Sequence, residues 1–154
     1  MFMSLESLTP VFFQLFLAAV LGMAVGFERW KIGKPAGMKT YALVSLGSAL
    51  FTILSVSGFS EFVGSGGYDP SRLASQVVVG VGFLGAGIIF SSQKEVHGLT
   101  TAAAIWVSAA VGTAVGLKFY AVAVFTAMLT VFILWFLRLI ESKVPRAEGK
   151  DEIS

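Results

Sequence analysis

The sequence predicts an all-α membrane protein, a polytopic bundle of five transmembrane helices. Hydrophobic residues make up 56% of the 154 residues and charged residues only 13%, whereas a soluble domain carries about 25% charged residues. Five apolar stretches of roughly 18 residues or more, long enough to cross a bilayer, alternate with short polar segments. We therefore expect one membrane domain over residues 1–140 and a charged, flexible cytoplasmic tail over residues 141–154.

The first span is expected over residues 10–27. Pro10 follows Thr9, and proline is favoured at the first position of a helix. No Lys or Arg precedes this span, so the sequence predicts a retained helix and not a cleavable signal peptide. Gly22 and Gly26 lie one helical turn apart, a spacing that permits close contact with another helix.

A basic loop follows the first span and holds Arg29, Lys31, Lys34 and Lys39. Basic residues just inside a membrane commonly meet anionic lipid, which we expect as a partner at this loop. Glu28 lies at the wrong end of the helix dipole for an acid and therefore needs a cation. One interpretation is a closed ion-pair cluster on Glu28, with cations from Arg29, Lys31 and Lys39. The other is a cytoplasmic site for a partner or an anionic ligand.

The second span is expected over residues 41–58 and the third over residues 69–90. After Arg72 the third span carries no charge, yet it contains four glycines, which are Gly80, Gly82, Gly85 and Gly87. A helix that faced only lipid would not need these glycines, whereas bare glycine surfaces let helices approach closely. We therefore predict that the third span is the central helix of the bundle, with Gly80 and Gly87 facing other helices.

One face of the third span is polar at its entrance. At about 100° per residue, this face joins the two glycines to Asp69, Arg72 and Gln76. Asp69 suits a helix N-cap and can also pair with Arg72 one turn on. Gln76 lies deeper, where an unpaired amide is costly. It is expected either to bond across to Thr101 or Ser108, or to line a polar surface for a substrate or partner.

Two nucleotide-binding patterns are rejected. Residues 80–85 read G-x-G-x-x-G, but the apolar run continues through the glycines and no βαβ unit surrounds them. Residues 33–40 read G-x-x-x-G-x-K-T, which differs from the phosphate-loop spacing and follows a membrane helix. We interpret the first pattern as a helix-packing surface and the second as part of the basic loop.

The fourth span, over residues 100–117, carries an unbroken row of small residues one turn apart. The row consists of Thr100, Ala104, Ser108, Gly112 and Gly116, and it predicts a second packing ridge. The fifth span, over residues 119–140, is bulky and contains no glycine, so it is expected at the lipid-facing periphery. The number of small-residue faces also predicts a homodimer or small homo-oligomer.

The distribution of Lys and Arg predicts the orientation. The first loop, the third loop and the C-terminal end hold nine basic residues, which are Arg29, Lys31, Lys34, Lys39, Lys94, Arg138, Lys143, Arg146 and Lys150. The opposite side holds two, Arg72 and Lys118. The positive-inside rule therefore places the N-terminus outside and the C-terminus in the cytoplasm.

The residue types exclude several kinds of chemistry. The chain has no cysteine and one histidine, His97, so neither a thiolate nor a histidine metal site is expected. No H-E-x-x-H or G-x-S-x-G pattern is present, so we expect no enzyme, no cofactor and no nucleic-acid partner. All nine acids lie at span ends, in loops or at termini, whereas a divalent-cation path favours oxygen ligands near the midplane. This favours a binding or regulatory protein, with ion transport as the alternative.

Several motifs, in order, resemble the MgtC/SapB family of membrane proteins. They are residues 26–29 (Gly-Phe-Glu-Arg), 33–40, 43–51, 69–72 (Asp-Pro-Ser-Arg), 80–87 and 98–106. The resemblance covers roughly residues 10–140. It implies a bacterial inner-membrane protein linked to growth at low magnesium, acid stress or survival inside host cells. Some members carry a soluble C-terminal domain, which we do not expect here, and the resemblance implies either a magnesium transporter or a regulator that binds other membrane proteins.

The candidate functional residues are the polar ones at the two ends of the bundle. They are Glu28, Arg29, Lys39, Asp69, Arg72, Gln76, Thr100 and Thr101.

Overall fold

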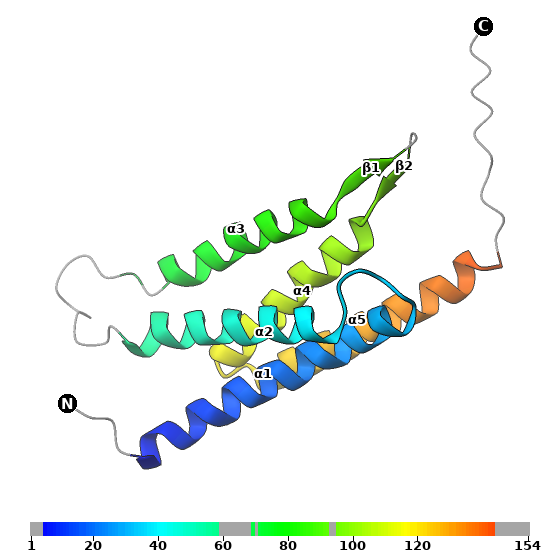
Figure 1. Ribbon diagram of the computed structural model, residues 1–154. Coiled ribbons are helices and arrows are strands. Elements are labelled where there is room, and N and C mark those ends of the chain that lie inside the picture. The colour runs from blue at the N-terminus through cyan, green and yellow to red at the C-terminus, as the bar shows by residue number, and fades with distance from the viewer. Residues whose placement is uncertain (1–4, 59–68, 70, 93–94, 144–154) are drawn as a thin grey trace, which may run out of the picture.

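The computed structural model describes residues 5–58, 69, 71–92 and 95–143. Within these residues the chain forms five α-helices and a short β-hairpin (Figure 1). The helices are α1 (Leu5–Lys31), α2 (Met38–Ile53), α3 (Ser71–Ile88), α4 (Leu99–Gly116) and α5 (Tyr120–Glu141). A π-helical turn, η1 (Leu54–Gly58), prolongs α2, and the hairpin pairs β1 (Phe90–Ser92) with β2 (Glu95–His97).

Four of the described helices are long and apolar enough to cross a membrane: α1, α2 with its π-helical turn, α4 and α5. The α3 helix contributes a shorter apolar segment, Ala74–Ile88. A mostly helical fold with five helices is thus confirmed, and α3 is shorter than the span predicted over residues 69–90. The predicted loop over residues 59–68 and the tail beyond residue 143 lie outside the described residues.

The α1 helix begins earlier than predicted, at Leu5, so Pro10 lies inside it and not at its start. Proline has no N–H to bond the carbonyl one turn back. Because Pro10 lies in the second turn, this loss falls near the helix end, where it disturbs the rest of the helix least.

The central helix of the bundle is α4, and the prediction that the third span is central was wrong. The α4 helix packs against α1, α2, α3 and α5, whereas α3 packs mainly on α4 and less on α2 (Figure 1). In the figure α3 follows one edge of the molecule. The physical reason is side-chain size: α4 buries small residues such as Ala104 and Ala109, while α3 leaves Val79 and Phe83 exposed.

Small residues bring α1 into backbone contact with the start of α2. A Cβ atom placed on Gly22 would lie 2.5 Å from the carbonyl oxygen of Tyr41. A Cβ atom on Gly26 would lie 2.8 Å from the Cα atom of Met38. Since real Cβ atoms do not approach other atoms so closely, these two positions of α1 require glycine at this packing distance.

The α4 helix approaches α2 in the same way, through the row of small residues. A Cβ atom on Gly116 would lie 2.7 Å from the Cβ atom of Thr52, and one on Gly112 would collide with the Ser45 carbonyl group. Ser45 and Thr52 are themselves buried. The helices α1, α2 and α4 therefore form a closely packed core, with a glycine on one side of each of these tight crossings.

The glycines of α3 behave differently. A Cβ atom on Gly80, Gly82 or Gly87 would meet nothing within 4 Å among the described residues. Gly85 makes an ordinary contact, 3.6 Å from the Cβ atom of Ala102. Within one chain, the prediction that Gly80 and Gly87 face other helices is therefore wrong, because α3 contacts α4 through a different side.

The connections at the two ends of α4 have left-handed residues. Gly98, with φ of 89°, precedes α4 and lies against the carbonyl group of Ile88. In the third loop, the described residues of β1 and β2 pair as antiparallel strands, with Phe90 opposite His97. Lys118, with φ of 65°, makes the tight turn into α5.

The α5 helix lies at the periphery, as predicted. Its large side chains are exposed: Phe125, Phe132, Trp135 and Phe136. Ala123 and Ala127 are the residues through which it buries surface against the bundle. In a membrane the exposed aromatic face would contact lipid.

Candidate functional site

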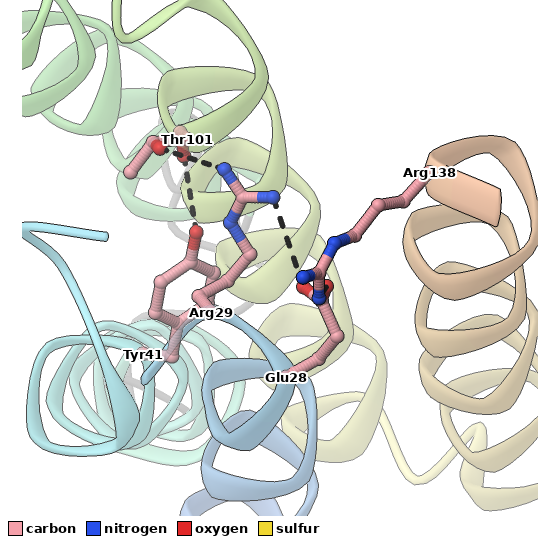
Figure 2. A network of polar contacts seen from close by, with 5 residues as sticks. All are labelled: Glu28, Arg29, Tyr41, Thr101 and Arg138. Atoms are coloured by element: carbon pink, nitrogen blue, oxygen red, sulfur yellow. Dashed lines mark hydrogen bonds and ion pairs between the residues drawn. The ribbon is translucent and has the colours of Figure 1, made fainter. Parts of the chain in front are cut away.

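Glu28 and Arg29 end the apolar part of α1 and leave the helix in different directions. Consecutive residues of a helix differ by about 100° around its axis. Figure 2 shows the Glu28 side chain directed toward α5, while Arg29 extends toward the start of α4. Both side chains are nearly buried, with exposed fractions of 10% and 6%. A charged pair is thereby fixed between the helices and held away from solvent.

Arg29 connects α1 to α4. Its Nη2 atom donates a hydrogen bond of 3.0 Å to the hydroxyl of Thr101. The Thr101 carbonyl accepts a second bond, of 3.2 Å, from the hydroxyl of Tyr41 on α2 (Figure 2). Thr101 therefore joins three helices at the first turn of α4, where its side chain is almost fully buried.

Glu28 lies between two arginines. Its Oε2 atom is 3.7 Å from Nη1 of Arg29, and its Oε1 atom is 3.9 Å from Nη1 of Arg138 on α5. Arg138 is 57% exposed. One carboxylate and two guanidinium groups leave this cluster with a net charge of +1. We call Glu28, Arg29 and Arg138 the charged cluster.

The hydrogen bonding of the charged cluster is incomplete. Among the described residues, neither carboxylate oxygen of Glu28 accepts a hydrogen bond, and Nε of Arg29 donates none. Both ion-pair distances exceed the 2.7–2.9 Å typical of a charge-assisted hydrogen bond. Buried polar groups are normally hydrogen-bonded, so the cluster has unused capacity for a donor and an acceptor.

The structure brings together part of the predicted cytoplasmic set. Glu28, Arg29 and Thr101 share one network, whereas Lys39 and Thr100 are exposed on the first turns of their helices. The expected cations for Glu28 were Arg29, Lys31 and Lys39. The structure supplies Arg29 and, in place of the two lysines, Arg138.

The polar residues of α3 are exposed, and Asp69 interacts with residues close to it in sequence. Asp69 accepts a 2.8 Å hydrogen bond from the backbone N–H of Ser71, as an N-cap does. Hydrogen bonds from the side chain and then the backbone of Ser71 lower the pKa of Asp69 below its usual value of 3.8, and the Arg72 charge adds a smaller effect. Asp69 thus has the capping role, with Arg72 beside it on the surface.

Gln76 does not make the expected cross-helix hydrogen bond. Thr101 accepts its bond from Arg29, and Ser108 donates a 3.0 Å bond to the Tyr41 carbonyl. Gln76 is exposed and borders a groove between α2 and α3. The expectation failed because α3 turns its glycine and glutamine face toward this groove and away from α4.

The groove between α2 and α3 is apolar, with a volume of about 450 Å³. Gly47 of α2 and Gly80 of α3 lie on its walls, and a Cβ atom on either would meet nothing within 4 Å. Because glycine has no side chain, this space stays open between the middle parts of the two helices.

Three residues that make polar contacts between helices were not among the predicted site residues: Gln14, Tyr41 and Arg138. The amide of Gln14 donates to the carbonyls of Val115 and Gly116, at 2.8 and 3.0 Å. The last carbonyls of a helix lack partners within it, so Gln14 completes the end of α4. A lone amide in an apolar span and an arginine near a span end were the available signals, but neither indicates its partner.

In the part of the chain that the structure describes, no group of three or more His, Cys, Asp or Glu side chains could hold a metal ion. Glu28, which is buried, faces guanidinium groups and not other acids. The chemistry available at the charged cluster is therefore charge pairing and hydrogen bonding.

Comparison with known proteins identifies relatives along most of the chain. The MgtC family model matches residues 15–143. The chain is 46% identical over 123 residues to the "Putative magnesium transporter YhiD" of Escherichia coli K12, covering 79% of this chain and 57% of that protein. It is 46% identical over 117 residues to the protein MgtC of Brucella abortus strain 2308, covering 76% of this chain and 45% of that protein.

A third relative is the protein SrpB of Synechococcus elongatus, 43% identical over 114 residues, which cover 68% of this chain and 62% of that protein. The chain thus spans about half to three fifths of the length of these curated relatives. No solved structure matches the chain.

Proposed function

Because the chain belongs to the MgtC family, we propose that it is a non-enzymatic regulator in the bacterial inner membrane. It acts by binding another membrane protein during adaptation to low magnesium, acid or host-cell stress. The proposal concerns the membrane domain, since the matched relatives extend well beyond the length of this chain.

The observation that carries this proposal is the surroundings of Glu28. A path for Mg²⁺ needs oxygen ligands, usually with acids among them. The buried carboxylate of Glu28 lies between two guanidinium groups, and the net charge of +1 disfavours a divalent cation nearby. Such a cluster suits a fixed structural contact or the recognition of a partner better than ion passage.

The packing of the core supports the same function. The α4 helix meets α2 at Gly112 and Gly116 with backbone atoms in contact, and α1 meets α2 at Gly22 and Gly26. These crossings leave no space between α1, α2 and α4 for a hydrated ion. The open groove between α2 and α3 offers a surface on which a partner helix could lie.

We propose a five-span topology, with the N-terminus outside and the C-terminus in the cytoplasm. The α3 helix, of 18 residues and so about 27 Å long, lies alongside α4 and is joined to it by the β-hairpin. A length close to the thickness of the hydrocarbon core supports its insertion as the third of the five spans.

Reporters fused at both ends test this topology. Five spans place the termini on opposite sides of the membrane, whereas four spans, without α3, place them on the same side. A cytoplasm-only reporter should be active at the C-terminus and inactive at the N-terminus. Activity at both ends, or at neither, would contradict the proposal.

Magnesium transport is the second candidate function, favoured by the name of the YhiD relative. Uptake of Mg²⁺ into sealed vesicles made with the purified protein separates the two candidates. A regulator should give uptake equal to that of protein-free vesicles, at every magnesium gradient applied. Saturable uptake above this background would overturn the regulator proposal and establish transport.

A further inference from the structure

The charged cluster lies at the level of the lipid headgroups in the proposed topology. Glu28 is three residues before Lys31, the end of α1, and Arg138 is three residues before Glu141, the end of α5. At 1.5 Å per residue, both are about 4–5 Å from the ends of these two helices. On this cytoplasmic side, phospholipid headgroups surround the outer surface of the bundle.

The cluster is accessible from that surface through Arg138. This side chain is 57% exposed and contacts Glu28 at 3.9 Å, which is longer than a hydrogen bond. Its flexible stem comes from the peripheral α5 helix, as Figure 2 shows. A small rotation of Arg138 would uncover the Glu28 carboxylate without disturbing Arg29, whose guanidinium remains bonded to Thr101.

The polar groups without hydrogen-bond partners indicate which chemical groups a ligand of this cluster needs. The two oxygens of Glu28 accept no hydrogen bond from a described residue, so they call for a donor with positive charge. The excess positive charge of the cluster, on an exposed guanidinium, calls for an anion. A ligand with a primary ammonium group and a phosphate a few ångströms apart meets both requirements.

We propose that the charged cluster binds the headgroup of phosphatidylethanolamine. The ammonium group donates hydrogen bonds to the Glu28 carboxylate, and the phosphate accepts bonds from the guanidinium of Arg138. The acyl chains lie against the exposed apolar face of α5. The site is independent of whether the protein regulates a partner or transports an ion.

Phosphatidylcholine is a matched control ligand, because its quaternary ammonium has the same charge but no N–H to donate. Binding to the full chain in detergent can be counted by native mass spectrometry with each lipid added separately. We expect phosphatidylethanolamine to bind about tenfold more tightly than phosphatidylcholine, the effect of losing one charge-assisted hydrogen bond. Equal binding of the two lipids would overturn the proposal.

Arg138→Gln tests the phosphate contact at an exposed position, where the substitution leaves the fold intact. It should weaken the binding of both phosphatidylethanolamine and phosphatidylcholine, because both lipids carry the phosphate. Lys143→Gln removes the same charge from an exposed position two residues beyond the end of the same helix and should leave the binding of both lipids unchanged. An equal loss in both variants would mean that the site senses only basic charge, and would contradict the proposal.

Glu28→Gln tests the ammonium contact. The amide keeps the size of the side chain but loses the negative charge, so the preference for phosphatidylethanolamine over phosphatidylcholine should disappear while phosphate binding remains. Phosphatidylglycerol provides the last comparison, because it has a phosphate and no ammonium. Tighter binding of phosphatidylglycerol than of phosphatidylethanolamine would overturn the proposed recognition of the ammonium group.

Discussion

The helices α3 and α4 have similar types of residues but pack in different ways. Both have glycines that share a face, two turns apart in α3 (Gly80 and Gly87) and one turn apart in α4 (Gly112 and Gly116), and polar side chains near one end. In α4 the glycines touch the backbone of α2, and Thr101 is buried in a hydrogen-bond network. In α3, Gly80 and Gly87 face open space, and Gln76 is exposed.

This difference shows that a row of small residues predicts that a close approach is possible, but not where it occurs. The side chains on the other faces of the helix determine where the close approach occurs. Many side chains of α4 are small and buried, so neighbouring helices can pack around it. The α3 helix carries Val78, Val79 and Phe83 on exposed faces and packs through one side, around Val81 and Gly85.

The largest effect is expected from leucine at the α4 crossing. Gly112→Leu would place a side chain against the Ser45 carbonyl group, where the backbone cannot move away easily. We expect the free energy of unfolding to fall by about 3 kcal/mol or more, and little folded protein to be recovered in detergent. The matched change on α3, Gly80→Leu, should leave yield and melting temperature near those of the wild type. A similar loss in both variants would remove the contrast between the two helices.

Adjacent threonines of α4 sharpen the comparison of buried and exposed polar groups. Thr101→Val keeps the shape of the side chain but removes the hydroxyl that accepts the Arg29 hydrogen bond. We therefore expect the free energy of unfolding to fall by about 1–3 kcal/mol. Thr100→Val, at the exposed neighbouring position, should change stability by less than about 0.5 kcal/mol. Thermal or denaturant unfolding of both variants in the same detergent measures the difference.

Part of this arrangement could be predicted from the sequence. The lengths of the apolar stretches predicted the helices and the turns between them, because a chain in lipid must satisfy its backbone hydrogen bonds within helices. The sequence also indicated that Glu28 needs a cation and that α5 is peripheral. The partners of Glu28 and the position of α3 could not be predicted, because they depend on which faces meet. Arg138 lies more than a hundred residues from Glu28, and no local pattern links two such positions.

Self-association tests whether the bare face of α3 remains free. Three small-residue faces predicted an oligomer, and the pairs Gly22/Gly26 and Gly112/Gly116 are used inside the chain. We propose that the remaining face, with Gly80 and Gly87, joins two copies of the protein. Gly80→Leu should then lower the dimer fraction measured by light scattering in mild detergent without changing stability. A wild-type protein that stays monomeric at all concentrations would contradict this.

The smallest effect is expected at the cap of α3. Because its hydrogen bonds with Ser71 lower the pKa of folded Asp69 below 3.8, ionisation of this carboxyl favours the folded state. This contribution is fully present above the unfolded pKa and is lost as pH falls through the folded pKa. The melting temperature of the wild type should exceed that of Asp69→Asn slightly at neutral pH, and the difference should vanish in strong acid. A difference that grows on acidification would have the wrong sign.

Growth at limiting magnesium decides most directly whether function resides in the charged cluster or on the α3 face. The wild type, Glu28→Gln, Arg138→Gln and Asp69→Asn are each expressed in a strain that lacks its own copy, and their abundance in the membrane is measured. We expect Asp69→Asn to support growth like the wild type, and both cluster variants to be present at normal abundance but to fail. Arg138→Gln, at an exposed position, keeps the test informative if Glu28→Gln folds poorly. Normal growth of Arg138→Gln together with failure of Asp69→Asn would contradict the assignment of function to the charged cluster.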